Sequence, residues 1–593
     1  MYKNGLIKIE LSSPDIRICN PFINAEKILK VINLSLSSFV LFPELCLSSY
    51  SAGDLFFKTA FLEENIKALE WLINTTSFEG VYILGIPLVI GTLIFNVAIV
   101  IQNKRILGII PKKTIPNYKE FNEKRWFQSG KNFSQTEIIL LGQKVPFGDI
   151  LFINKEFDLI FGVEICQDLW TIESPSDLLV LNGAHIIFNL SSSTEHIGKT
   201  EQRLMAVIDH SRKQIGGYFY TSSGITESST DAVFSNHKIA AVLGELIGEK
   251  HLFEPDVSLV VDVCLDSIKN QRIVDTTYGD QIINKFFKFQ KVNFKLKETK
   301  KYILENNLDR LPFIPKNNLF KQLKIADMLQ VCSLQSKLYY LPEAKVILNI
   351  TNSIEDFLSL MVVYKVFINL KKDLNNLIII LPYYELSEAS YFNKIQQFLK
   401  QLEIKNIVKT ISLSKKNNKL MLDYKKDILR ETNNKDINNE KNLFLFTYNL
   451  SDIALGNIQI KFFYNYVYNV NVGIPNTFMQ KLFLYHLESD DWNMDSELKK
   501  FYLSKANDFL KEKIIVEDFI LYYFLFKGLK KDKIVWFLKE AFNFDSKKSL
   551  KLVNDYLQKF YKSQYKRQYI SPGPKILENS LSPRTEFKLS FDF

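Results

Sequence analysis

A stretch of 21 residues without a charged side chain, Val81–Ile101, constrains the fold of this chain more than any other feature. It is long enough to cross a bilayer as a helix. Gly85, Pro87, Gly91 and Asn96 interrupt it, however, and valine and isoleucine are frequent in the rest. Glycine and proline break helices, and β-branched residues favour strands. The sequence therefore predicts two or three buried strands here instead of a membrane span.

The first 265 residues alternate short apolar runs with helix-length amphipathic segments. Such alternation is typical of an α/β or layered α–β domain. The expected strands are Leu6–Ile9, Phe39–Phe42, Tyr82–Pro87, Phe95–Ile101, Leu159–Val163, Ile186–Asn189, Tyr218–Thr221 and Leu259–Val263. The expected helices include Ala25–Leu34, Phe61–Asn74 and Lys199–Ile215.

A second α/β pattern begins near residue 319 and predicts an open parallel sheet. Its expected strands are Val346–Ile350, Leu377–Pro382 and Leu443–Phe446, and its expected helices are Asn318–Tyr340, Phe357–Leu370, Glu388–Leu402 and most of 479–562. We therefore expect domains at 1–265 and 319–593, with a surface insertion at Ser414–Asn442. The pattern weakens over 266–318, which fits either a linker or an irregular extension of the first domain.

Composition limits the partners that this chain could have. A net charge of +10 is small for 593 residues, and the basic residues are mostly lysines without the arginine clusters of base readout. No nucleic-acid partner and no membrane partner are therefore expected. Five widely spaced cysteines without a CxxC pair, and a first segment without an apolar core, predict a cytoplasmic protein.

Three apolar runs of the first half are each followed by a reactive side chain: Glu44, Lys112 beside Lys113, and Cys166. A cysteine thiolate can attack an amide or nitrile carbon and form a thioester. A glutamate can take the thiol proton and then activate water, while a lysine ammonium stabilises the oxyanion. Taken singly, each residue also has an ordinary structural explanation, since a buried cysteine usually serves packing.

The segments around these residues resemble those of the nitrilase superfamily in order and spacing: FPEL, PKKTIPNY with EKRWF, and GVEICQDLW. The similarity is greatest to the glutaminase domain of glutamine-dependent NAD synthetases, and NLSSSTEHIGK and ESSTDAVFSNH extend it over residues 1–265. The resemblance implies an αββα sandwich. It also implies roles for a general base, Glu44; a catalytic lysine, Lys112, with Lys113 as competitor; a nucleophile, Cys166; glutamine-binding residues Tyr118, Ser193 and Lys199; and a supporting carboxylate, Glu164.

The second half resembles the synthetase domain of the same fused family. The similar segments are TYNLSDIALGN, YNVNVGIPNTF and YKSQYKRQYISPGPKILENSLSPR. The resemblance implies a Rossmann-like adenine nucleotide α-hydrolase domain that uses ATP and Mg²⁺ and holds no prosthetic group. It further implies that deamido-NAD is amidated to NAD with ammonia taken from glutamine, and that the chain forms a homo-oligomer.

The phosphate-binding loop departs from the family pattern SGGxDS, because this chain has Thr351, Asn352, Ser353, Ile354, Glu355 and Asp356 there. Side chains replace both glycines, and Asp356 adds a negative charge where a triphosphate would approach. Glu355 could still reach a metal ion and is the metal candidate. The nucleotide-binding candidates are Thr351, Asn352, Ser353, Glu355, Asp356, Thr447, Asn449, Asp452 and Lys566.

Three explanations of this loop stay open: a remodelled but working loop, a non-catalytic remnant, or a shifted alignment. The main expectation is a glutamine-dependent NAD synthetase. The alternative is a glutaminase or amidase with a decayed synthetase domain. A scaffold with relic catalytic residues is a third hypothesis, and the presence of Glu44, Lys112 and Cys166 argues against it.

Overall fold

The computed structural model describes residues 2–131, 133–251, 258–283, 288–351, 353–383, 389–405, 407–411, 441–458, 466–488 and 494–589. The chain divides into two compact units, Met1–Asn307 and Leu308–Phe593. None of the helices within the described residues combines the length and the apolar character that crossing a membrane requires.

The first unit contains two large sheets. One sheet has the order β1-β2-β3-β4-β5-β6, with β19 paired to β2, and its strands are β1 (Tyr2–Lys3), β2 (Leu6–Ser12), β3 (Phe39–Leu41), β4 (Val81–Ile90), β5 (Leu93–Gln102), β6 (Arg105–Pro111) and β19 (Ser258–Cys264). The other has the order β18-β17-β15-β13-β12-β11-β20, from β11 (Ile150–Asn154), β12 (Leu159–Ile165), β13 (Ile186–Ser191), β15 (Gly217–Ser222), β17 (Lys238–Val242), β18 (Glu245–Lys250) and β20 (Gln290–Asn293).

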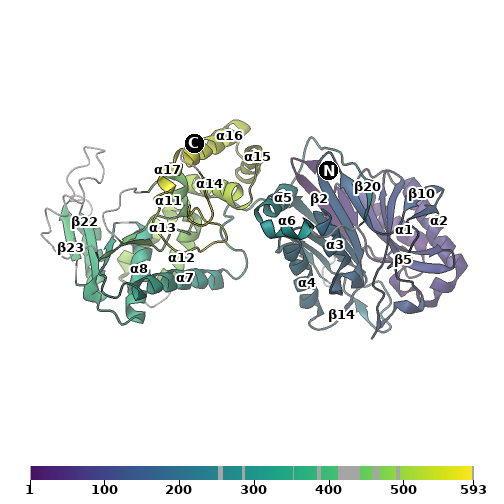
Figure 1. Ribbon diagram of the computed structural model, residues 1–593, viewed down its shortest axis with the longest axis horizontal. Helices are drawn as coiled ribbons and strands as arrows, with labels where there is room; N and C mark the ends of the chain where they lie inside the picture. The colour runs from purple at the N-terminus through teal and green to yellow at the C-terminus, as the bar shows by residue number, and fades with distance from the viewer. Residues whose placement is uncertain are drawn as a thin grey trace. The chain divides into compact units, whose positions relative to one another are not determined.

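Helices cover the outer face of each sheet, so the first unit is an αββα sandwich (Figure 1). The helices are α1 (Pro21–Leu34), α2 (Thr59–Thr75), α3 (Pro175–Leu181), α4 (Lys199–Lys213), α5 (Leu265–Val274) and α6 (Thr276–Ile283). α1 and α2 pack on the first sheet, and α3, α4 and α6 pack on the second. Apolar side chains of both sheets fill the space between them, and Phe39 meets Phe161 there at a ring-centroid distance of 5.3 Å.

The uncharged stretch Val81–Ile101 forms the antiparallel pair β4 and β5, which confirms the strand prediction. The turn between them contains Gly91 at a φ of +62°, a conformation that glycine adopts without strain. Gly85 serves a different purpose on β4. A Cβ atom there would lie 2.2 Å from the backbone nitrogen of Leu45, so the loop after β3 can approach β4 only because residue 85 is glycine.

Short antiparallel strand pairs and 3₁₀ turns complete the first unit. Two of the pairs are hairpins, β7 (Asn117–Tyr118) with β8 (Phe121–Asn122) and β9 (Glu137–Leu140) with β10 (Gln143–Pro146), and the third joins the distant strands β14 (Thr194–Glu195) and β16 (Val233–Phe234). The 3₁₀ turns are η1 (Tyr50–Phe57), η2 (Glu123–Arg125) and η3 (Cys166–Trp170).

The second unit contains a parallel sheet with the strand order β23-β22-β21-β24-β25. Its strands are β21 (Val346–Asn349), β22 (Leu377–Tyr383), β23 (Ile407–Ile411), β24 (Leu443–Phe446) and β25 (Tyr466–Asn469). The order therefore reverses between β21 and β24, as in a doubly wound Rossmann-like sheet. Ligands of such sheets bind at the carboxyl ends of the strands where the order reverses.

Helices accompany this sheet and make up most of the chain after it. They are α7 (Leu319–Tyr339), α8 (Ile354–Asn369), α9 (Ala389–Gln401), α11 (Leu450–Leu455), α12 (Asn476–Glu488), α13 (Ser496–Asp508), α14 (Glu512–Leu521), α15 (Lys531–Phe542), α16 (Ser546–Lys562) and α17 (Gln564–Arg567). The expected strands and helices of this half are therefore confirmed within the described residues. Most of the expected insertion, Ser414–Asn442, lies outside them.

The described residues of 266–307 belong to the first unit. β20 lies parallel to β11 at the edge of the second sheet, and Tyr302 donates a hydrogen bond to Asp262 of β19 at 2.7 Å. The functional boundaries 1–265, 266–318 and 319–593 remain a proposal about how the chain is divided between activities.

We predict that Gly85→Ala destabilises the first unit by about 1–3 kcal/mol, because its Cβ meets backbone atoms that cannot move aside. Calorimetric melting of the full chain measures this as an earlier unfolding transition. Gly279→Ala is the matched control, since Gly279 lies in α6 and a Cβ there meets nothing within 4 Å. Equal melting of the two variants would contradict the close approach at Gly85.

Candidate functional site

Glu44 lies in the tight loop that follows β3, at the end of the first sheet, and is fully buried. Its Oε1 atom accepts hydrogen bonds from Lys112 Nζ at 2.5 Å and from Asn96 Nδ2 at 2.7 Å. Its Oε2 atom is buried and has no hydrogen-bond partner among the described residues. A carboxylate oxygen in that state is available to accept a proton from a substrate or a neighbouring side chain.

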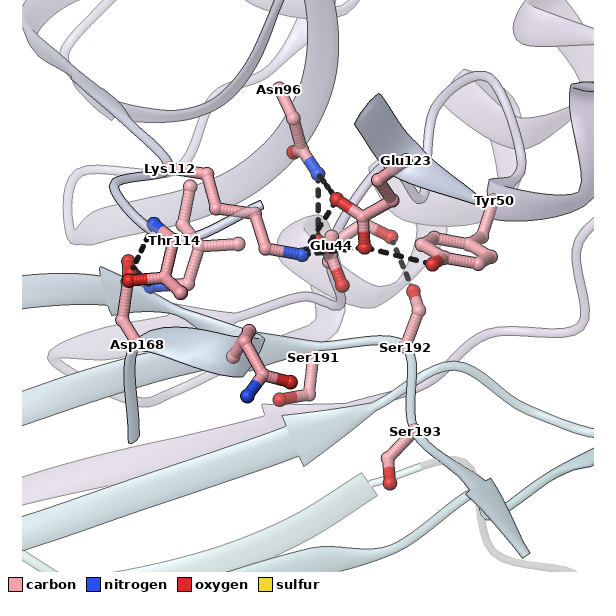
Figure 2. Close-up of polar contacts among 12 residues, drawn as sticks. Glu44, Tyr50, Asn96, Lys112, Thr114, Glu123, Asp168, Ser191, Ser192 and Ser193 are labelled. Carbon is pink, nitrogen blue, oxygen red and sulfur yellow. Dashed lines mark hydrogen bonds and ion pairs between the residues drawn. The ribbon is translucent and has the colours of Figure 1, made fainter. Parts of the chain in front are cut away.

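Lys112 is also fully buried, directly after β6, and its ammonium lies between two carboxylates (Figure 2). Besides Glu44 it donates to Glu123, at 2.7 Å to Oε1 and 2.8 Å to Oε2. Tyr50 donates to the same carboxylate at 2.8 Å. Lys113 points elsewhere and pairs with Asp149. The geometry therefore places Lys112, and not its neighbour, beside Glu44.

Cys166 begins the turn η3 where β12 ends, and its side chain is 8% exposed. Its backbone has a φ of +46°, which is uncommon for a residue with a Cβ and marks a turn held by its surroundings. Asp168 supplies that hold, because its carboxylate accepts from the backbone nitrogens of Ile165 at 3.3 Å and Thr114 at 2.8 Å. Asp168 thus ties the cysteine turn to the loop that carries Lys112.

The charges of this cluster act on one another. Burial raises the pKa of the Cys166 thiol to about 12, the negative charge of Glu44 adds to the increase, and Lys112 opposes it. Burial likewise raises the pKa of Glu123 to about 7. Burial would lower the pKa of Lys112, but Glu123 and Glu44 outweigh that effect and keep it cationic. The resting cysteine is therefore a thiol, and its attack needs a base close by.

The predicted substrate-binding residues lie around this cluster at different depths. Ser193 is buried after β13, Tyr118 is half exposed and donates to Gln167 at 2.8 Å, and Lys199 lies over the Trp170 ring at 4.1 Å. Glu164 lies apart from the thiol, on the other face of β12. It accepts from Tyr218 and from the backbone of Ser176, so it holds the second sheet against α3.

Asn96, Glu123 and Asp168 were not among the predicted site residues. Glu123 stands in the quoted segment EKRWF and Asp168 in GVEICQDLW, so both lay within reach of the sequence comparison. Asn96 had no such signal, because it lies inside the long apolar stretch. Only the folded structure shows that its side chain donates to Glu44 at 2.7 Å and lies 3.5 Å from Glu123.

The second unit has a separate cavity of about 280 Å³ at the point where the strand order reverses. It is lined by Asn349, Thr351, Ser353, Glu355, Asp356, residues 444–448, Asp452, Asn457 and Ile458. These described lining residues include three carboxylates and neither lysine nor arginine. Burial raises the pKa of Glu355 to about 8, and Asp452 adds to that increase. The cavity is therefore acidic.

The loop from β21 to α8 is closed by its own side chains. Asp356 Oδ2 accepts from the backbone nitrogen of Thr351 at 2.8 Å and from its hydroxyl at 2.5 Å. Ser353 caps α8 by accepting from the backbone nitrogen of Asp356 at 3.2 Å. A backbone amide that would otherwise be available to a phosphate thus already donates to a carboxylate.

The cavity brings together most of the predicted nucleotide-binding residues of the second unit. Asn449 lies beside it and contacts Glu355 at 3.4 Å. Lys566 does not line it and instead donates to the carbonyl of Gly456 at 2.6 Å. Asn352 lies outside the described residues.

We predict that Glu123→Gln makes the Cys166 thiol more reactive, because it removes one negative charge from the buried cluster. Alkylation of Cys166 by iodoacetamide at pH 8 should become faster, by up to about tenfold for one pKa unit. Peptide mass spectrometry measures this rate with the exposed Cys332 as internal reference.

Asp149→Asn is the matched control, since it removes a carboxylate from the exposed pair with Lys113. It should leave the alkylation of Cys166 unchanged. A slower reaction of Cys166 in Glu123→Gln would mean that Glu123 activates the thiol and would contradict the charge argument.

Known proteins with similar sequences align with both units of the chain. Residues 24–263 match the carbon–nitrogen hydrolase family. Over its whole length the chain is 25% identical to the glutamine-dependent NAD(+) synthetase of Mycobacterium tuberculosis, of which the alignment covers 97%. It is 30% identical to the synthetase of the same name from Aquifex aeolicus over 270 residues, 44% of each chain.

Among solved structures, a glutamine-dependent NAD(+) synthetase from Cytophaga hutchinsonii aligns with 99% of this chain and 97% of its own, at 15% identity and a TM-score of 0.40. One from Acinetobacter baumannii, in complex with ADP, aligns with 97% of each chain at 18% identity and a TM-score of 0.37. The sequence similarity covers both units and includes a carbon–nitrogen hydrolase match in the first, so the chain is similar over its whole length to glutamine-dependent NAD(+) synthetases.

Proposed function

We propose that this chain makes NAD from deamido-NAD, with ATP as energy source and with ammonia that its own first unit releases from glutamine. The buried ammonium of Lys112 between Glu44 and Glu123, close to Cys166, supports the glutamine reaction more than any other observation. A carboxylate, an ammonium and a thiol in this arrangement suit the cleavage of an amide bond.

In the first step, Glu44 Oε2 takes the proton of Cys166, and the thiolate attacks the side-chain amide carbon of glutamine. The free oxygen of Glu44 supports this role, because no other described group competes for it. Lys112 donates to the oxygen that becomes negative in the tetrahedral intermediate. Glu44 then returns the proton to the leaving nitrogen, so that ammonia departs and a thioester remains on Cys166.

In the second step, water cleaves the thioester and releases glutamate. Glu44 takes a proton from the water and gives it back to the sulfur, which restores the thiol. Lys112 stays charged throughout, since the two carboxylates hold its pKa high despite burial. Tyr118, Ser193 and Lys199 hold the glutamine, and Glu164 supports the strand that carries Cys166.

In the second unit, ATP activates the carboxylate of deamido-NAD by adenylation, and ammonia displaces AMP. The products are NAD, AMP and pyrophosphate. The crevice between β21 and β24 is the candidate site, with Thr351, Ser353, Glu355, Asp356, Thr447, Asn449 and Asp452 as the proposed contacts. Asn352 and Lys566 remain proposed from the sequence resemblance alone.

The acidic crevice suits a divalent cation better than a bare triphosphate. Glu355 is the proposed Mg²⁺ contact, because its buried carboxyl has a raised pKa and a cation would stabilise its charged form. When bound, Mg²⁺ would neutralise phosphate charge. We further propose that the protein acts as a homo-oligomer in the cytoplasm, with glutamine, deamido-NAD and ATP as its small-molecule partners.

We predict that Cys166→Ala forms neither glutamate nor NAD from glutamine, deamido-NAD, ATP and Mg²⁺, because no thioester can form. The same variant should still form NAD when ammonium chloride replaces glutamine. A coupled assay measures glutamate and NAD in one tube, with the wild-type chain beside it.

Cys46→Ala is the matched control, since Cys46 is also a buried free cysteine of the first unit but has no proposed role in the reaction. It should keep both products. Glutamate without NAD in the wild-type chain would favour a glutaminase with a decayed second unit. Glutamate from Cys166→Ala would contradict the proposed nucleophile.

We predict that Asp356→Ser binds ATP–Mg²⁺ on the order of tenfold more tightly than the wild-type chain, because the loop amide of Thr351 loses its internal carboxylate partner. Isothermal titration calorimetry measures the affinity directly. Asp373→Asn makes the same charge change at an exposed turn of the second unit and should leave the affinity unchanged.

Weaker ATP binding by Asp356→Ser would mean that Asp356 holds the loop in its binding form. Absence of ATP binding in the wild type and in both variants would count against the synthetase reaction itself.

A further inference from the structure

Arg203 of α4 is fully buried, yet its guanidinium carries a permanent charge. Nη1 donates to Ser193 Oγ at 2.9 Å, Nη2 donates to Glu195, and Nε donates to His237 Nδ1 at 3.0 Å. Burying a charge is costly unless it is paired and hydrogen-bonded. This arginine therefore holds two segments in one arrangement: residues 193–195 around β14, and His237 directly before β17.

The segment that Arg203 holds touches the reacting groups. The hydroxyl of Ser192 donates to the backbone carbonyl of Glu44 at 3.1 Å. The backbone amide of Ser192 donates toward the sulfur of Cys166. The backbone amide of Ser193 donates to Ser222 at 2.9 Å, which fixes the segment from the other side. Arg203 is therefore linked to the Cys166–Glu44 pair through Ser193 and its neighbour Ser192.

A second layer of contacts holds Arg203 itself. His237 accepts from Arg203 through Nδ1, so its neutral ring carries the proton on Nε2 and donates to Glu249 Oε1 at 2.9 Å. His251, on the partly exposed side, lies 3.3 Å from the same oxygen and stacks on His237 at 4.8 Å. The contacts form one line from the surface to Ser193.

These same side chains have the composition of a metal site, since ligand atoms of His237, Glu249 and His251 all lie within 4.8 Å of one another. A histidine that binds a metal usually donates its other ring N–H to an acceptor. Here the other nitrogen of His237 faces the N–H of Arg203. Binding through Nε2 would set two donors against each other, so the proton arrangement favours a hydrogen-bond line over a metal site.

We propose that Arg203, held by His237 and Glu249, is a positioning residue that fixes Ser193 for glutamine. The inference rests on the proposed glutaminase reaction. Arg203 acts through Ser193 and contacts no substrate, so its loss weakens glutamine binding more than it slows the chemical step.

Arg203→Lys tests the proposal, because lysine keeps the charge but cannot reach three partners with a planar fork. The KM for glutamine should rise about tenfold or more, while kcat stays within about threefold. The double variant Ser193→Ala with Arg203→Lys should match the larger single effect, since both changes remove one interaction. A KM increase equal to the product of the two single increases would mean independent effects and would overturn the proposal.

His237 supplies an independent check of the same line. His237→Ala should raise the KM for glutamine as Arg203→Lys does. His237→Asn keeps an acceptor for the guanidinium and should recover most of the wild-type KM. Equal loss in both variants would overturn the role of this contact.

Arg272→Lys is the matched control. Arg272 is a largely buried arginine of the same unit, and within the described residues its guanidinium donates to the carbonyls of Ile215 and Ala184 and not to the Ser193 segment. It should lower the melting temperature without changing the KM for glutamine. A KM increase equal to that of Arg203→Lys would reduce Arg203 to a general structural role.

Two further measurements separate the remaining outcomes. NAD formation from ammonium should be unchanged in Arg203→Lys. A wild-type chain without any glutaminase activity would instead contradict the proposed function itself. Stoichiometric zinc in the purified wild-type chain, absent from Glu249→Gln, would overturn the hydrogen-bond line in favour of a metal site.

Discussion

The first unit depends on one buried ammonium among carboxylates. Lys112 has no exposed surface, and neither water nor salt can screen its pairs with Glu44 and Glu123. Desolvating such charges costs several kcal/mol each, so the cluster persists only because its geometry pairs them. Loops after β3 and β6 and the turn η2 must therefore meet at one point. The close approach at Gly85 and the backbone contacts of Asp168 are what allow this meeting.

In the second unit, the carboxylates that line the crevice have no lysine or arginine beside them among the described lining residues. Its crevice lies where the strand order reverses, which is where such a sheet offers a ligand site, but its lining carboxylates repel phosphate. Asp356 both contributes to this repulsion and occupies an amide of the loop. A remodelled loop of this kind keeps the architecture of a nucleotide site while changing the free energy of binding a nucleotide there.

The sequence predicted the layers of the fold well, for physical reasons, and the structure brings two of the predicted site residues, Glu44 and Lys112, into contact. An uncharged apolar stretch such as the one ending at Ile101 forms buried strands because glycine and proline interrupt it and prevent a long helix. Short or polar strands were missed: β17 has only five residues, and β18 carries several polar side chains. β20 lies in the expected linker, although Val292, Phe294 and Leu296 alternate there with polar residues. Glu123 stands in a segment that the sequence comparison covered, whereas Asn96 joins the site through a tertiary contact with Glu44 that no local pattern reveals.

Labelling with a diazo-ketone analogue of glutamine tests the central claim most directly. The thiolate displaces nitrogen from such an analogue and stays bonded to its carbon, so peptide mass spectrometry identifies the nucleophile. The account predicts one adduct per chain, on Cys166, with loss of glutamine-driven NAD formation in proportion and with the ammonium-driven reaction retained. An adduct on another cysteine, or full glutamine-driven activity in the labelled chain, would contradict it.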